Sequence, residues 1–450
     1  MDALIVIFLS GLISLFLGLL KKPSLALIMN LVGLTAAFVL MYNYNGYVSP
    51  LQNYANALAF NGPQLYFSLM AIVFTMLTLL VGYVSQSKDV NHYADLTSLL
   101  MFSLTGAICL IGFKDFFMFF LGLEILSIPV YVLVGSRKDQ SISSEAALKY
   151  FFTGSFATAI LLFGIGLVFG ATGSFQIQEI GFAVVSGLYT PSLMLIGIFM
   201  IIAALLFKVG AVPFHFWNPD VYQGSPKPVM AYMSTVVKIA GFIAFFKLIR
   251  GTFGTISDQW MYFMYFVIIA SLFIGYLSGL RQSSFKRLLA YSGISNTGLA
   301  LLAVVSGTDF SERNLFLFLL SYGAATFILI AISIALEDEE DKIQSFEGIG
   351  YKNPILGVFL LISLLSLSGI PPFSGFFGKF LLIQDIIENH PILGIAAVVS
   401  SVIGAFIYIR LLLSIFKKDA NAKKIKLKPM QSIVLSASAI AILCGWLLIL

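Results

Sequence analysis

The sequence predicts an all-α polytopic membrane protein, and three observations support that fold class. Apolar residue types make up 59% of the 450 residues, charged types only 10%, and the mean hydropathy is +0.98. Soluble domains carry about 25% charged residues, so this chain has too few charges to cover a water-facing surface. Apolar runs of span length also follow one another along the chain. These features exclude a soluble enzyme, a disordered chain and a nucleic-acid binder, despite a net charge of +5.

A membrane-spanning helix needs roughly 20 mainly apolar residues, and by that rule the sequence predicts about fourteen spans in one membrane-embedded unit. The first run is followed by Lys21 and Lys22 and has no basic stretch before it. That order is wrong for a cleaved signal peptide, so the run is expected to be retained. The predicted spans cover residues 2–20, 24–42, 64–86, 95–112, 114–135, 144–172, 192–223, 227–250, 258–280, 284–306, 311–336, 353–388, 391–417 and 430–449.

Prolines interrupt the seventh and twelfth spans. Pro213 lies in the seventh, and Gly369, Pro371 and Pro372 lie together in the twelfth. Proline removes a backbone donor and bends a helix, and irregular backbone at membrane depth needs protein or water around it. The breaks are five spans apart, so spans 4–8 and 9–13 are predicted to be two five-helix repeats. Because five is odd, the second repeat is inverted, an arrangement typical of carriers.

This reading divides the chain into four parts. Residues 1–94 are expected to form an N-terminal three-helix segment, and 95–250 the first repeat. The second, inverted repeat covers 258–417, and residues 430–450 form a C-terminal helix.

Basic residues in the connectors predict the orientation. Even-numbered connectors and their flanks hold only Lys114, Arg250 and Arg313. Odd-numbered connectors are therefore expected on the cytoplasmic side, with both termini on the opposite side. The odd-numbered connectors and their flanks hold seventeen basic residues: Lys21, Lys22, Lys88, Arg137, Lys138, Lys227, Arg281, Lys286, Arg287, Lys342, Lys352, Lys417, Lys418, Lys423, Lys424, Lys426 and Lys428.

Four ionisable residues lie near the centres of predicted spans: Glu124, Lys208, Lys238 and Lys379. Each charge at the bilayer centre costs about 2.5–3.5 kcal/mol on insertion scales, and such residues mark ion or proton pathways. A static ion pair that fixes helix packing is the structural alternative for any one of them. One carboxylate cannot neutralise three amines, however, so the set favours a proton path.

Other polar residues near the spans have open interpretations. Lys149, Lys247 and Arg410 lie within about two turns of span ends, where snorkelling to the interface is the default. His215 is either a proton relay or a neutral residue that caps the broken helix. The polar residues of span ten could order water or only aid helix packing; they include Tyr291, Ser295 and Asn296.

No redox or metal site is predicted. Cys109 and Cys444 cannot supply the four thiolates of an iron–sulfur cluster, and the three histidines are scattered. The acidic run 337–341 is expected to be a solvated connector, with a docking patch for a partner as the alternative.

Four segments carry a resemblance to a known family, the antiporter-like membrane subunits of respiratory complex I (NADH:quinone oxidoreductase). The resemblance extends over roughly residues 64–417. Within the family, PDVYQGSP combined with Lys379 is similar to the subunit N branch. The segments are FLGLEILSIPVYVLVG (120–135), FKVGAVPFHFWNPDVYQGSPKPV (207–229), FKRLLAYSGISNTGLALLA (285–303) and SGIPPFSGFFGKF (368–380).

The resemblance implies a proton-pumping subunit without redox chemistry of its own, in a bacterial inner membrane. NADH, FMN, iron–sulfur clusters and quinone would be used by other subunits. The implied partners are antiporter-like subunit M, the small membrane subunits, the lipid bilayer and protons. By motif, Glu124, Lys208, Lys238 and Lys379 match the family's proton relay, and Lys149 matches a retained sixth-helix lysine. Asparagine at 296, where the family often has histidine, puts a relay role there in doubt.

The expected mechanism is a midplane Glu/Lys relay. A Glu124–Lys208 ion pair holds a proton, a signal from a neighbouring subunit weakens the pair, and the proton moves through Lys238 to Lys379 and out. Three alternatives stay open: a subunit of a multi-subunit Na⁺(K⁺)/H⁺ antiporter, a chain with its own quinone-reducing site, and a passive spacer.

Overall fold

The computed structural model describes residues 2–20, 22–43, 57–86, 90–338, 341–419 and 423–448. These residues form helices and connectors and contain no β-strand. Within them, twelve helices are long and apolar enough to cross a membrane, and α1 and α16 are apolar but shorter. The chain is therefore an all-α, multi-pass membrane protein, as predicted. The connector expected at 43–63 lies largely outside the described residues.

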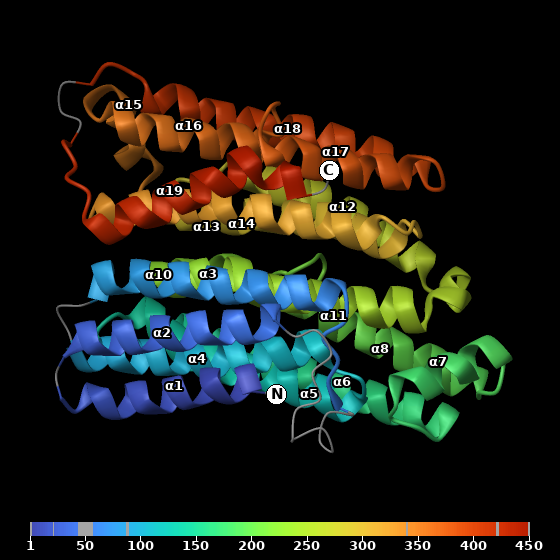
Figure 1. Cartoon of the computed structure of the whole chain (residues 1–450). Helices are drawn as coiled ribbons and strands as arrows, with labels where there is room; N and C mark the ends of the chain where they lie inside the picture. The colour runs from blue at the N-terminus through green and yellow to red at the C-terminus, as the bar shows by residue number, and fades with distance from the viewer. Residues whose placement is uncertain are drawn as a thin grey trace. The chain divides into compact units, whose positions relative to one another are not determined.

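The chain divides into two compact units (Figure 1). The first contains residues 1–209 and 224–262. In it α1 packs on α2 and α4, α4 on α5, and α6 on α8. Its elements are α1 (Asp2–Gly18), α2 (Pro23–Tyr42), α3 (Pro63–Gln86), α4 (Val90–Gly112), α5 (Phe116–Val134), α6 (Ser141–Thr172), α7 (Ile177–Ser186), α8 (Pro191–Val209), α10 (Lys227–Tyr232), η2 (Met233–Val237), α11 (Lys238–Phe245), η3 (Phe246–Thr252) and η4 (Gly254–Gln259).

The second unit contains residues 210–223 and 263–450. In it α14 packs on α16, α17 and α19, and α16 packs on α18. Its elements are α9 (Trp217–Gly224), α12 (Met261–Gly279), α13 (Phe285–Val305), α14 (Ser311–Ala335), η5 (Ile343–Phe346), α15 (Ile349–Lys352), α16 (Pro354–Ser368), α17 (Ser374–Ile387), α18 (Pro391–Ile415), α19 (Pro429–Cys444) and η6 (Gly445–Leu448). The last residue of α9 and the first two of α12 belong to the first unit.

Both predicted helix breaks are present. The seventh predicted span consists of α8, an irregular stretch and α9, and the twelfth consists of α16, a short break and α17. Among the helices of ten or more residues in the described chain, α7 was not predicted; it has 10 residues, with one face buried and the other exposed. It is too short for a span and therefore gave no hydropathy signal.

The acidic connector that follows α14 has a structural role, because its Asp341 contacts the start of α13. The Asp341 carboxylate accepts hydrogen bonds from Ser284 Oγ (2.7 Å) and from the backbone N–H of Lys286 (2.9 Å). The first N–H groups of a helix have no partner within the helix, so Asp341 helps to cap α13. Two residues of the predicted acidic run, 339 and 340, lie outside the described part of the chain.

Candidate functional site

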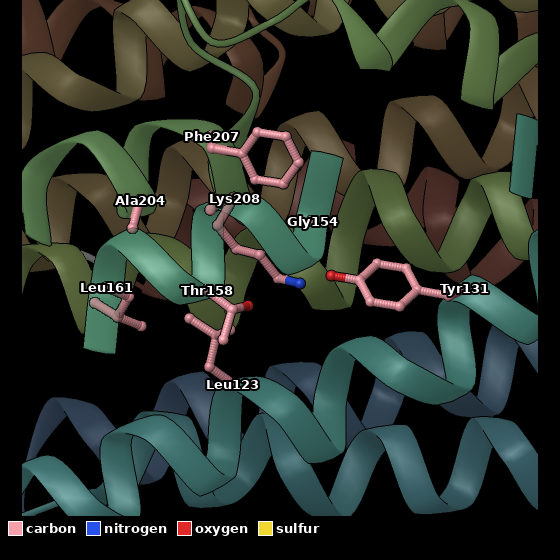
Figure 2. A pocket seen from close by; sticks show the side chains of 9 residues that line it. Leu123, Tyr131, Gly154, Thr158, Leu161, Ala204, Phe207 and Lys208 are labelled. Carbon is pink, nitrogen blue, oxygen red and sulfur yellow. The ribbon is translucent and has the colours of Figure 1, made fainter. Parts of the chain in front are cut away.

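Lys208 lies at the end of α8 with a side chain only 4% exposed. Its ammonium donates to Ser127 Oγ on α5, and Nζ lies 5.8 Å from the centre of the Tyr131 ring. Figure 2 shows the Lys208 ammonium and the Tyr131 hydroxyl pointing toward one another. A buried ammonium needs polar partners, and α5 supplies them here.

A small pocket adjoins the Lys208 side chain, between helices of the first unit (Figure 2). The pocket has a volume of about 10 Å³, which is roughly enough for one water molecule. Thr158 on α6 lines the pocket, and its hydroxyl donates to Glu124 Oε1 at 2.7 Å. In this structure, then, Glu124 and Lys208 are not in direct contact; the expected ion pair is replaced by separate hydrogen bonds to Thr158 and Ser127.

The Tyr131 hydroxyl fits because α6 has a glycine beside it. A Cβ atom at Gly154 would lie 2.2 Å from Tyr131 Oη. No heavy-atom pair tolerates that separation, so any larger residue at 154 would displace the tyrosine. Gly154 therefore fixes the position of Tyr131 beside the pocket.

Lys238 begins α11, with a side chain 4% exposed. A short π-helical turn, η2, precedes it, and such wide turns are frequent at functional sites. One turn further along α11, a Cβ atom at Gly241 would lie 3.9 Å from Lys208 Cγ. The helix that carries Lys238 thus packs closely against the side chain of Lys208.

Lys379 in the second unit is equally buried, at 6% exposure. It lies on α17 and donates to the carbonyl of Leu367 near the end of α16. Together with Asn296 and Tyr322, it also lines a second small pocket, with a volume of about 10 Å³. Lys379 and Lys208 therefore share three features: burial, a neighbouring helix break and a pocket the size of one water.

The two breaks are built alike. Gly210 and Gly369 adopt left-handed backbone conformations, with φ of 74° and 76°, which glycine adopts without strain. Three residues after each, Pro213 and Pro372 follow a cis peptide bond. A side chain from the next half-helix then lies over each glycine, Asn218 over Gly210 and Lys379 over Gly369.

α9 is held to α13 by a cluster of hydrogen bonds. Arg287 Nη1 lies 2.7 Å from Asp220 Oδ1 and 3.0 Å from Gln223 Oε1. Lys286 Nζ donates to the carbonyl of Gln223 at 3.0 Å. The second half of the broken seventh span is therefore anchored to the second unit, to which residues 210–223 belong.

The remaining predicted residues lie outside the two lysine pockets. His215 is buried with Nδ1 lacking a hydrogen-bond partner in the described residues; its relay or capping role stays a prediction. Lys149 is half-buried on α6, and Tyr291 lies under the Arg287 guanidinium, 6.0 Å from its ring centre. Ser295 donates to the Leu272 carbonyl at 2.9 Å, which is a helix-packing contact. Lys247 donates to the carbonyl of Phe113.

Sequence reasoning missed Ser127, Tyr131 and Thr158. A usable signal existed for two of them, because Glu124, Ser127 and Tyr131 follow the i, i+3, i+7 spacing of one helix face. Thr158 gave no such signal, since its role depends on how α6 packs on α5.

No group of three or more His, Cys, Asp or Glu side chains that could hold a metal gathers in the described part of the chain.

Comparisons with known proteins match this architecture. Residues 114–404 match the family model described as NADH:quinone oxidoreductase/Mrp antiporter, TM. A protein of Cytophaga hutchinsonii named NADH-quinone oxidoreductase subunit N is 35% identical, covering 93% of this chain and 91% of the relative. A chain of respiratory complex I from Thermus thermophilus superimposes with a TM-score of 0.81 at 28% identity, covering 99% of this chain and 98% of that one. A chain of the Mrp complex from Dietzia sp. shares the fold, with a TM-score of 0.81, 18% identity, and coverage of 100% and 96%.

Proposed function

Because this chain belongs to the NADH:quinone oxidoreductase/Mrp antiporter transmembrane family, we propose that it is a proton-translocating membrane subunit of an NADH:quinone oxidoreductase. It is of the subunit N type, to which the 35%-identical relative belongs by name. As part of that translocase it moves protons while other subunits carry out the redox chemistry.

One observation carries the proposal for the mechanism: buried lysines lie beside helix breaks and pockets the size of a water molecule. Lys208 and Lys379 both have this setting. Water in a pocket beside a lysine allows that lysine to exchange its proton. Ordinary structural lysines in a membrane need neither feature.

We infer the following sequence of events. A proton reaches Lys208 through the pocket that Thr158 and Tyr131 border. The Glu124 carboxylate, held by Thr158, stabilises the charged lysine through the pocket without direct contact. When a signal from the neighbouring subunit shifts this carboxylate, the proton leaves Lys208 for Lys238, on the adjacent helix α11, and then moves to Lys379. In this proposal Lys208 and Lys238 belong to the first repeat, residues 95–250, and Lys379 belongs to the second, inverted repeat, residues 258–417.

The partners follow from the same assignment. We propose contacts with subunit M and with small membrane subunits of the complex, in a bacterial inner membrane with both termini on the periplasmic side. FMN, iron–sulfur clusters and the quinone site belong to other subunits in this proposal.

The test is NADH-driven quinone reduction and lumen acidification, followed together in sealed vesicles that contain the purified complex. We expect Lys208→Ala to lose acidification and much of the coupled turnover. Glu124→Gln should lose acidification while the complex still assembles. The control is Lys352→Ala, which removes an equal charge from an exposed connector residue and should pump normally.

Sodium separates this proposal from the cation antiporter. If wild-type proton movement requires Na⁺, or if the chain purifies without an NADH-oxidising partner, the antiporter function replaces it. If Lys208→Ala pumps normally, the chain acts only as a passive structural spacer.

A further inference from the structure

A cavity of about 300 Å³ opens in the second unit among the connectors at the ends of α12 and α14. Gln282 and Ser283 from one connector and Gln344 and Glu347 from the other line it. Ser283 and Gln344 are exposed, so water can enter, and the volume holds several water molecules. Both connectors are odd-numbered and are predicted to face the cytoplasm.

Three of the residues that line this cavity are apolar and buried: Leu288 on α13, and Ile407 and Leu411 on α18. Arg410 and Ser414 of α18 line it as well. Leu288 lies one turn before Ser292, and Ile407 directly precedes Tyr408. Apolar constrictions can gate water columns by drying and wetting. The apolar residues of the lining are therefore close neighbours, on the same two helices, of the polar groups Ser292 and Tyr408.

α13 and α18 share a buried polar cluster. Ser292 Oγ and Tyr408 Oη lie 2.5 Å apart. Asn296 Nδ2 donates to the Ser292 carbonyl at 2.9 Å and reaches Tyr408 Oη at 3.5 Å. All three side chains are at most 3% exposed. Burying two hydroxyls and an amide costs free energy unless each forms hydrogen bonds, so apolar side chains would pack these two helices at lower cost.

The cluster leads to the pocket of Lys379. Asn296 and Ser366 both line that pocket. Asn296 Oδ1 and Ser366 Oγ are buried and have no hydrogen-bond partner within the described residues. Tyr276, whose ring stands edge-on to that of Tyr408 with centroids 6.4 Å apart, lies beside the same cluster. Buried polar atoms of this kind are normally satisfied by ordered water, and the pocket has roughly room for one.

We propose that this route is a second proton entry, which leads from the cytoplasmic cavity through Ser292 and Tyr408 to Lys379. It rests on the proposed function, since it needs Lys379 to exchange protons during turnover. Each hydroxyl accepts a proton on an oxygen lone pair and releases its own proton to the next acceptor. Asn296 does not relay the proton. Its Oδ1 orients the water molecule that passes the proton to the Lys379 amine, which becomes an ammonium. The hydroxyls then rotate back.

This entry brings a second proton to Lys379 during turnover, in addition to the proton that arrives from Lys208 through Lys238. Lys379 then serves as the end of a separate path as well as the last member of the relay.

The first test is Tyr408→Phe, which keeps the ring and removes the hydroxyl. In sealed vesicles we expect the ratio of protons translocated to NADH oxidised to fall. Tyr351→Phe, at an exposed position away from the route, is the matched control and should keep the wild-type ratio.

The second test blocks the cavity and does not depend on the folding of the Tyr408 variant. Ser283→Cys is placed in a Cys444→Ser background, which removes the exposed native thiol, and is modified with a bulky, charged, membrane-impermeant thiol reagent from the cytoplasmic side. Modification should lower the proton ratio. Modification of Lys417→Cys, an exposed site that does not line the cavity, should leave it unchanged.

The outcomes separate the two proposals. If wild-type vesicles fail to acidify, the proposed function is wrong and the second entry falls with it. If wild type acidifies and Lys208→Ala does not, but Tyr408→Phe and the modified Ser283→Cys keep the full ratio, only the second entry is wrong.

Discussion

At the scale of single residues, the environment of Lys208 depends on three uncharged neighbours. Ser127 accepts from its ammonium, Thr158 holds Glu124, and Tyr131 faces it across the pocket (Figure 2). Uncharged groups can donate and accept without the desolvation cost of a second buried charge. They keep Lys208 satisfied and still leave it free to exchange its proton.

Gly154→Ala should show how much the Tyr131 position matters. The new methyl group would overlap the tyrosine hydroxyl, and such overpacking typically costs about 1–3 kcal/mol. We expect a lower melting temperature of the purified complex and reduced acidification. Gly166→Ala on the same helix, where a Cβ atom meets nothing within 4 Å, should change neither. Equal behaviour of the two variants would contradict a positioning role for Gly154.

At the scale of secondary-structure elements, the two broken spans share one backbone pattern, and the half-helix α9 has a fixed attachment. The breaks at Gly210 and Gly369 carry the left-handed residue and the cis proline, whereas α9 is fixed to α13 through Asp220, Gln223 and Arg287.

A charge exchange tests the attachment of α9. Asp220→Arg and Arg287→Asp should each weaken pumping, because each leaves two like charges facing one another. The double variant restores opposite charges and should recover part of the activity. A double-mutant cycle on the melting temperature should give a coupling of about 0.5–3 kcal/mol. Additive effects would mean that the ion pair does not hold α9 in place.

Much of this level of structure could be predicted from sequence, and the exceptions have physical reasons. Long apolar runs and proline clusters report burial and chain breaks directly, so the predicted ranges agree with α3, α8 and α18 and with both breaks. Hydropathy cannot detect α7, which lies below span length. It also cannot foresee that Glu124 bonds to Thr158 and Lys208 to Ser127, because side-chain packing between helices decides such pairings. Tyr408, on the thirteenth predicted span, gave no signal apart from its polarity.

At the scale of the whole molecule, the bias of basic residues makes a prediction about sidedness. Odd-numbered connectors should face the cytoplasm and even-numbered ones the periplasm. In a Cys444→Ser background, Lys352→Cys should react with an impermeant thiol reagent only from the cytoplasmic side. Ser186→Cys, an exposed residue at the end of α7, should react only from the other side. The reverse pattern would invert the membrane orientation, and labelling of both from one side would overturn the span count.

The ion pair between Asp220 and Arg287 also bears on biosynthesis. The two residues are 67 positions apart in the chain, and ribosomes add about 5–20 residues per second. For roughly 3–13 s the nascent chain therefore exposes an acidic half-helix whose basic partner does not yet exist. A pause in translation or a truncation between residues 224 and 286 would prolong that state. In that state α9 would lack its hydrogen bonds to α13 and would be open to the proteases that survey newly inserted membrane proteins.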